Sequence, residues 1–136
     1  MISRFLDTNV LVYTDDHSQP EKRSTALALV KRCFRDRSGV LSTQVLQEYF
    51  VTTTRKLRVE PEIARSKIEV FSRLGLVLIG LPDILSAIDL HRTHQLSLWD
   101  ALLVSVATRA GCSVLFTEDL QHGQRFGKLE VVNPFH

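Results

Sequence analysis

Four acidic residues adjoin apolar runs of the kind that form a protein core, and their chemistry is the first clue to function. They are Asp7, Glu48, Asp100 and Asp119. An ionised carboxylate beside buried chain is unfavourable unless it is paired or holds a metal ion. The segments around these four residues contain few basic side chains. They therefore indicate a shared cation and predict metal-dependent chemistry on a phosphodiester bond.

Mg²⁺ and Mn²⁺ are the cations that such residues would select, because both prefer oxygen ligands. Without a cation, two unit charges roughly 4 Å apart repel by about 4 kcal/mol at an effective dielectric constant of 20. A bound ion would polarise the phosphate and activate a water molecule, and a second ion would stabilise the leaving oxygen. We expect Asp7 and Asp100 to be the strongest direct ligands. Glu48 and Asp119 are expected to ligate either directly or through water.

Three further side chains are candidates for this site. We expect Asn9 and Thr117 to donate hydrogen bonds that fix the orientation of the carboxylates. Arg125 is a candidate contact to a substrate phosphate, and a surface role is an equally good interpretation. Each acid also has a simpler structural interpretation as a turn or helix-cap residue. Glu48 is the hardest to explain in that way, because it lies within a predicted helix among apolar neighbours.

The composition is that of one soluble domain, residues 1–136. The chain is 44% hydrophobic and 24% charged, which excludes a disordered or fibrous protein. It shows no secretory signal, and its longest apolar run, residues 74–81, is too short to span a membrane. Two cysteines form no disulfide framework, so we expect a cytoplasmic location. The net charge of +2 is compatible with a polyanionic partner. The basic stretches 22–37 and 55–58 can be solvated helix faces, an RNA surface, or both.

Short apolar strands alternate with amphipathic helices along the chain. The predicted strands are residues 2–6, 40–42, 77–79, 113–116 and 129–132. The predicted helices are residues 9–13, 20–37, 43–57 with Thr43 as the cap, 61–74, 82–94, and one that begins at 97–100 and ends at Gly111. This alternation predicts an α/β domain, a three-layer sandwich with a central, mainly parallel sheet of about five short strands flanked by helices.

The predicted fold places three of the four acids at one edge of the sheet. Asp7 and Asp119 lie just past the ends of predicted strands, and Asp100 lies at the start of a helix, where the helix dipole favours an anion. Ligands of open α/β sheets bind outside the carboxyl ends of the strands. The acids are therefore predicted to meet where such a ligand would bind.

The segments that contain the four acids resemble those of a PIN domain. They are Asp7 to Tyr13 (DTNVLVY), Ser42 to Glu48 (STQVLQE), Leu98 to Leu103 (LWDALL) and Leu115 to Leu120 (LFTEDL). Their order and spacing are similar to those of the bacterial VapC-type toxins. The resemblance covers nearly the whole chain, including the ending from Gln121 to Phe135. One Asp-Thr-Asn alone would be a weak motif, whereas four motifs in order are specific.

The resemblance implies a PIN-like fold and a Mg²⁺- or Mn²⁺-dependent endoribonuclease that hydrolyses RNA with a metal-activated water. It implies the toxin of a bacterial type II toxin–antitoxin pair, inhibited by a cognate VapB-like antitoxin and forming a homodimer. The acidic positions of the family correspond to Asp7, Glu48, Asp100 and Asp119 of this sequence, and none is missing.

Two other functions remain open from the sequence. Asp7 after a first strand is also similar to the acid of haloacid dehalogenase-like phosphatases, but those proteins have a second aspartate where this chain has Asn9. For the phosphotransfer function of receiver domains, Asp83 is only a loose candidate acceptor. A catalytically silent PIN-fold binding module would be expected to lose acids, and this chain retains all four.

Overall fold

A six-stranded sheet forms the middle layer of the protein, with the strand order β3-β2-β1-β4-β6-β5. This computed structural model describes residues 2–136. Five strands are parallel: β1 (Arg4–Leu6), β2 (Gly39–Ser42), β3 (Gly75–Val77), β4 (Val114–Phe116) and β6 (Leu129–Val132). The short β5 (Arg125–Phe126) is antiparallel to β6. The first strand of the chain is therefore near the centre of the sheet.

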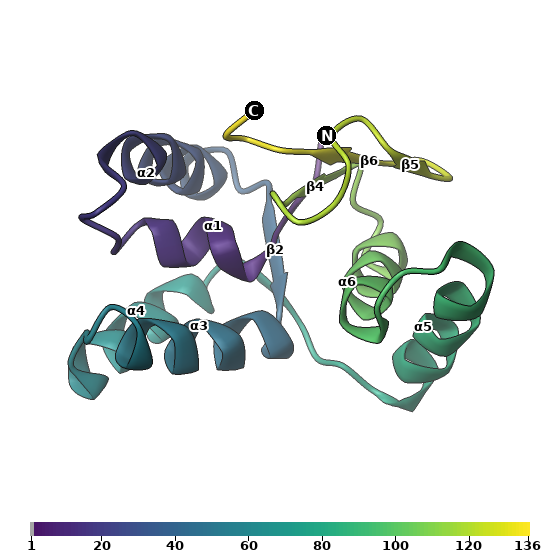
Figure 1. Ribbon diagram of the computed structural model, residues 1–136, viewed down its shortest axis with the longest axis horizontal. Coiled ribbons are helices and arrows are strands. Elements are labelled where there is room, and N and C mark those ends of the chain that lie inside the picture. Colours follow the sequence, from purple (N-terminus) through teal and green to yellow (C-terminus); the bar gives the residue numbers. More distant parts are fainter. Residues whose placement is uncertain (1) are drawn as a thin grey trace.

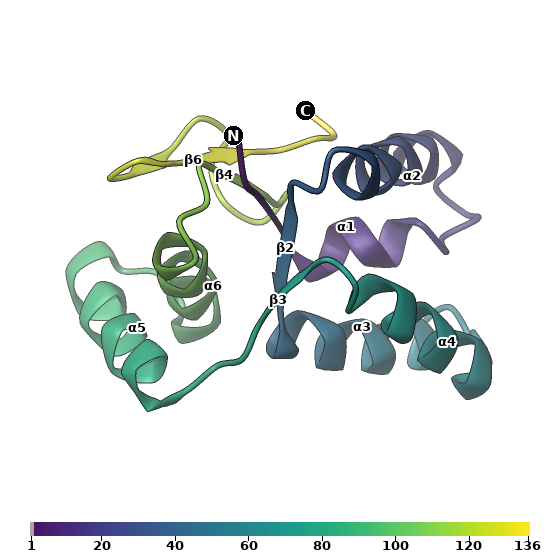
Figure 2. The same cartoon turned by 180° about the vertical axis from the view of Figure 1, so that it is seen from behind.

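Helices cover both faces of this sheet. Figures 1 and 2 show the following helices on one side: α1 (Thr8–Tyr13), α2 (Pro20–Arg35), α3 (Thr43–Arg55) and α4 (Pro61–Phe71). The pair α5 (Leu81–His94) and α6 (Leu98–Arg109) lies on the other side. The predicted three-layer α/β fold with a mainly parallel central sheet is confirmed. Among the residues described, no helix is long and apolar enough to cross a bilayer.

Local sequence explains where most of these elements begin. Pro20 and Pro61 occupy the first helical positions, where a missing N–H costs nothing. Strand β1 has helices above and below it, which accounts for the full burial of Phe5 and Leu6. The cap of α3 is Ser42, whose hydroxyl accepts from the N–H of Val45. The prediction of Thr43 as the cap was therefore wrong by one residue.

Several predicted boundaries differ from the observed ones. Helices α2, α3 and α4 end two or three residues earlier than predicted, and the third strand begins at Gly75 instead of Val77. Arg37 and Arg58 adopt left-handed backbone conformations, each with φ of 55°, close to the ends of α2 and α3. The sequence does not show which non-glycine residues adopt this uncommon conformation, so these helix ends could not be predicted to the residue. The two-residue strand β5 was also not predicted, so the sheet has six strands where about five were expected.

Candidate active site

The acidic residues emerge at the carboxyl ends of adjacent strands. Leu6 of β1 pairs with Phe116 of β4, so the chain leaves both strands side by side. The backbone N–H of Asp7 donates to the carbonyl of Phe116 at 3.0 Å. On the other side of β1, strand β2 leads into α3, and that helix brings Glu48 back towards the start of α1. This topology assembles the site from segments more than 100 residues apart in the chain.

Asp7 is buried at the start of α1, with both carboxylate oxygens held. Its Oδ1 accepts from the N–H of Thr8 at 2.6 Å and caps the helix. Its Oδ2 accepts from Thr117 Oγ1 at 2.7 Å and from Asn9 Nδ2 at 3.2 Å. Burial raises the pKa of Asp7 from 3.8 to about 6, against the lowering effect of the Thr117 and Thr8 hydrogen bonds. The charges of Asp119 and Glu48 raise it further, so these acids lie within electrostatic reach of Asp7.

Asn9 links two of the acids. Its Nδ2 lies 3.2 Å from Asp7 Oδ2 and 3.1 Å from Asp119 Oδ2, so both carboxylates share one donor. The Oδ1 atom of Asn9 is buried and has no hydrogen-bond partner among the described residues. Buried polar atoms are normally satisfied, and an orphan acceptor beside two carboxylates is the kind of atom that a cation or its bound water satisfies.

Asp119 and Asp100 are electrostatic neighbours. The residue Asp119 is exposed, but partial desolvation of its carboxyl raises its pKa, and the charges of Asp100 and Glu118 raise it further, while the Asn9 hydrogen bond lowers it. Asp100 lies in the first turn of α6, where its N–H donates to the capping hydroxyl of Ser97 at 3.1 Å. The negative charge of Asp100 therefore sits at the positive end of a helix.

Glu48 reaches the site from α3. Its Oε1 accepts from Thr8 Oγ1 at 2.9 Å and from Gln44 Nε2 at 3.4 Å. The residue is exposed and turns away from the apolar face of its helix. Of the four acids, only Asp7 is therefore buried, and this difference was not predicted from the sequence.

The donor set fits a hard divalent cation. Carboxylate, hydroxyl and amide oxygens are the ligands that Mg²⁺ and Mn²⁺ prefer. As the side chains stand in residues 2–136, however, no three His, Cys, Asp or Glu residues are close enough together to hold a metal ion. The acids lie along one edge, with the Asn9 amide bonded to both Asp7 and Asp119, and do not converge on a single point.

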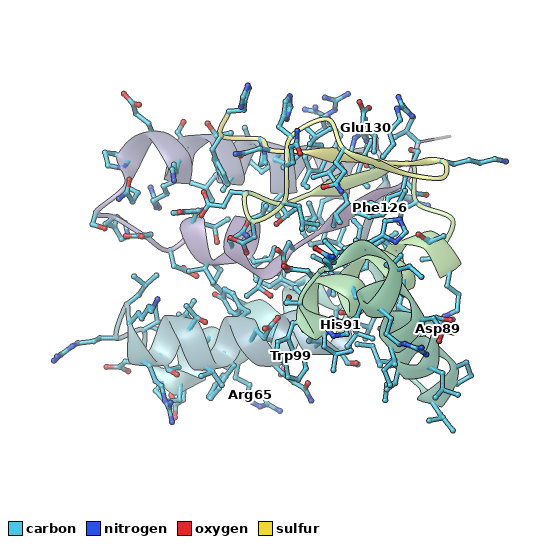
Figure 3. All side chains as sticks on the ribbon, turned by 45° about the vertical axis from the view of Figure 1, so that its right-hand side comes forward. Arg65, Asp89, His91, Trp99, Phe126 and Glu130 are labelled. Atoms are coloured by element: carbon cyan, nitrogen blue, oxygen red, sulfur yellow. The ribbon has the colours of Figure 1, made fainter. Side chains whose placement is uncertain are left out.

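Arg125 does not join this group. In the sheet, Arg125 of β5 is paired with Glu130 of β6, and Glu130 is paired with Val114 at the start of β4. Asp119, in contrast, follows the end of β4. The Nη2 atom of Arg125 lies 3.7 Å from Glu130 Oε2. Figure 3 labels Glu130 on the sheet strand that carries this pair. The register places Arg125 at the amino end of the parallel strands, away from the acids, so the predicted phosphate contact finds no support in the structure.

Sequence reasoning missed several side chains that hold the site. Thr8, which donates to Glu48, lies within the Asp-Thr-Asn motif and could have been considered from its position. Glu118 was overlooked, although it separates Thr117 from Asp119: it binds Tyr13 and Lys22, which lie about 100 residues earlier. Contacts over that distance in sequence leave no periodic signal along the chain.

A pocket of about 680 Å³ is lined by residues along α5, by the second half of α6 and by the β5–β6 hairpin, and by none of the four acids. Its lining includes Thr108 and Arg109 from the end of α6, whereas Asp100 lies at the start of that helix. Two other lining residues, Asp89 on α5 and Phe126 on the β5–β6 hairpin, are labelled in Figure 3. The pocket is therefore separate from the acidic edge.

Fold and site together define a three-layer α/β domain with acidic residues at the carboxyl edge of its parallel sheet. The profile of the PIN domain family matches residues 4–126. The chain therefore belongs to the PIN domain family. No curated protein sequence matches this chain.

Several solved structures share the fold. FitAB bound to an IR36 DNA fragment has a TM-score of 0.72 and 18% identity, covering 98% of this chain and 96% of that one. VapC20 of Mycobacterium tuberculosis, a toxin that cleaves the sarcin–ricin loop, has a TM-score of 0.68 and 19% identity, with 86% and 92% covered. VapBC2 from Rickettsia felis bound to a promoter DNA fragment has a TM-score of 0.67 and 20% identity, with 96% and 97% covered. At these identities the similarity establishes the fold.

Proposed function

We propose that this protein is a metal-dependent endoribonuclease and the toxin of a bacterial toxin–antitoxin pair. The observation that carries the proposal is the acidic edge: Asp7, Glu48, Asp100 and Asp119 come from four separate segments. The charges of Glu48 and Asp119 act on Asp7, and the charge of Asp100 acts on Asp119. Membership of the PIN domain family supports the nuclease activity. The similarity to a toxin that cleaves the sarcin–ricin loop supports RNA as the substrate.

Asp7 and Asp100 would hold a Mg²⁺ or Mn²⁺ ion, with Glu48 and Asp119 bound directly or through water. Such an ion supplies a polarised phosphate and a more acidic water molecule. The chain contributes orientation: Thr8 and Thr117 hold the two oxygens of Asp7, and Asn9 sets the spacing between Asp7 and Asp119. Since the pKa of Asp7 is about 6, its carboxylate is mostly ionised at neutral pH.

The proposal includes a VapB-like antitoxin, a homodimer and a cytoplasmic location. Toxin–antitoxin complexes from Klebsiella pneumoniae and Rickettsia felis are among the similar structures, which supports an antitoxin partner. Exposed apolar side chains along α5 support association with another chain, because large exposed apolar patches usually mark interaction surfaces. They are Leu81, Ile84, Leu85 and Ile88.

Cleavage of RNA by the purified protein tests the proposal. We expect cleavage that requires Mg²⁺ or Mn²⁺ and is abolished by EDTA. Asp7→Asn and Asp100→Asn should each lower kcat/KM by at least about 100-fold, since substitutions beyond the direct ligands alone cost 10- to 100-fold. Asp89→Asn, an exposed acid on α5, is the matched control and should remain active. Activity that survives both Asp7→Asn and Asp100→Asn would refute the assignment.

Asp83, the candidate acceptor for phosphotransfer, is engaged in other contacts. Asp83 is buried, and its carboxylate accepts from Arg109 at 2.5 and 3.0 Å and from the N–H of Gly80 at 3.0 Å. Its oxygens are therefore engaged in joining α5 to α6. Incubation with acetyl phosphate should leave the intact mass unchanged. The same RNA cleavage assay distinguishes a nuclease from a catalytically silent PIN-fold binding module.

A further inference from the structure

Glu118 lies between two residues of the acidic site, but its side chain is bound elsewhere. Its Oε1 accepts from the hydroxyl of Tyr13 at 2.6 Å, and its Oε2 accepts from Lys22 Nζ at 3.1 Å. Lys22 Nζ also lies 3.2 Å from the Tyr13 hydroxyl. The three side chains form a closed triangle of polar contacts, which we call the Glu118 clamp.

The clamp is packed against aromatic rings. Lys22 Nζ lies 4.9 Å from the centroid of the Tyr13 ring and 5.6 Å from that of Phe135. The Tyr13 and Phe135 rings meet edge to face with their centroids 4.9 Å apart. The Glu118 side chain is only 22% exposed, so its charge is partly shielded from solvent. An ion pair in this setting is better fixed in position than one on an open surface.

Residues 117–119 are attached to both ends of α1. At the start of the helix, Thr117 binds Asp7 and Asp119 binds Asn9. At its end, Glu118 binds Tyr13, the last residue of the helix. Strand β4 stops at Phe116, and Thr117 makes the next contact to β6 through Val132. Beyond that point, Asp119 is held by its own N–H, which donates to Thr117 Oγ1 at 3.1 Å, and by the side-chain contacts to α1.

The clamp also reduces the repulsion between the neighbouring carboxylates of Glu118 and Asp119. Glu118 is adjacent to Asp119, so two negatively charged side chains follow one another in the chain. Lys22 places a positive charge 3.1 Å from Glu118 and offsets part of this repulsion. A free carboxylate at position 118 would instead compete with Asp119 for any cation bound nearby.

We propose that Glu118 is a positioning residue, which binds Tyr13 and Lys22 and thereby turns the Asp119 carboxylate towards Asn9 and Asp7. This inference rests on the proposed function and deepens it, because it states how the fourth acid is set in place for a divalent ion. Glu118 itself does not bind the ion.

Binding of Mn²⁺ to the full chain, measured by titration calorimetry without RNA, tests this proposal. Glu118→Ala should weaken Mn²⁺ binding about tenfold, as is usual when the support of a metal ligand is removed. Tyr13→Phe should weaken it to a similar degree. The double variant should be no worse than either single variant, because the two side chains act through one contact. Glu118→Gln retains an oxygen acceptor for Tyr13 and should restore most of the affinity.

Cleavage kinetics and a matched control complete the test. The kcat of Glu118→Ala should fall while the KM for RNA stays unchanged, since substrate binding is not altered. Glu69→Ala removes another ion-paired glutamate, the partner of Arg65 on α4, at 2.5 Å, and should change neither quantity. Figure 3 labels Arg65 on α4, which lies away from the strand ends.

The possible results separate clearly. Mn²⁺ affinity that stays within about twofold of the native value in Glu118→Ala and Tyr13→Phe would overturn the inference, even if the melting temperature falls. If Glu118→Ala does not fold, Tyr13→Phe decides the question by the same measure. Native protein that binds no Mn²⁺ would overturn the proposed function and this inference with it. If Asp100→Asn loses Mn²⁺ binding while Glu118→Ala and Tyr13→Phe keep it, only the inference is overturned and the proposed function stands.

Discussion

Asp7 combines a structural role with a chemical one. It caps α1 through Oδ1 and is buried, and burial raises its pKa from 3.8 to about 6. A shift of this size means that the ionised carboxylate destabilises the metal-free fold by an amount on the order of 3 kcal/mol. The Asp7 side chain is therefore unfavourable in its ionised form in the metal-free protein. A bound cation stabilises that form, and a proton removes its charge.

This burial predicts how stability depends on pH in the absence of metal. The folded state binds the Asp7 proton more tightly than the unfolded state, so the contribution of Asp7 is fully present below about pH 4 and is lost as the pH rises through 6. Asp7→Asn retains an acceptor for the Thr8 N–H and carries no titrating charge. We expect this variant to lose that part of the decline between about pH 4 and pH 7.

Urea unfolding in EDTA across this pH range measures the effect. The Asp89→Asn variant, changed at an exposed acid, should retain the native decline. An Asp7→Asn variant whose stability falls as steeply as that of the native protein would show that Asp7 is not the titrating group.

At the level of the elements, the sequence predicted the helices and strands well where burial or proline decides them. The apolar run before Asp7 becomes a central strand, and Pro20 and Pro61 start helices. Helix ends next to a residue in the left-handed conformation, such as Arg37, could not be predicted, because the sequence does not show which non-glycine residues adopt it. The Gly111 stop of α6 was correct: this glycine has φ of 76°.

The left-handed conformation of Gly111 gives a specific prediction. A Cβ at this position would meet nothing within 4 Å, so Gly111→Ala adds only backbone strain. We expect a loss of about 1–2 kcal/mol in the free energy of unfolding. Gly80→Ala, at an extended residue with φ of −120°, should change it by less than about 0.5 kcal/mol. Equal losses in the two variants, measured by denaturant unfolding, would contradict this explanation.

Across the whole molecule, Asp7 and Asp119 lie at the carboxyl ends of the parallel strands, whereas Arg125 lies at their amino ends. Asp7 and Asp119 could be placed at the carboxyl edge from sequence, because both follow apolar strands. Asn9 was expected to donate to the carboxylates, but the Glu118 clamp could not be predicted, since it depends on contacts between residues about 100 positions apart. The position of Arg125 was also beyond prediction, because it depends on the unpredicted pairing of β5 with β6.

Arg125 provides a test of this division. Since it lies at the amino end of the strands, Arg125→Ala should leave RNA cleavage within about threefold of the native rate, within the range of a surface change. Asp119→Asn, at the carboxyl edge, should lose activity in the same assay. A loss in Arg125→Ala comparable to that of Asp119→Asn would place substrate on the β5–β6 side of the protein.

The order of the strands has a consequence for synthesis. Strand β1 is made first, yet β4, its neighbour in the sheet, comes late, and the bond between Asp7 and Thr117 joins residues 110 positions apart. Such distant pairing forms only after the intervening chain is available. A nascent chain thus cannot complete its acidic edge until Asp119 has emerged from the ribosome. Under the proposed function, the growing polypeptide therefore has no complete nuclease site before that point.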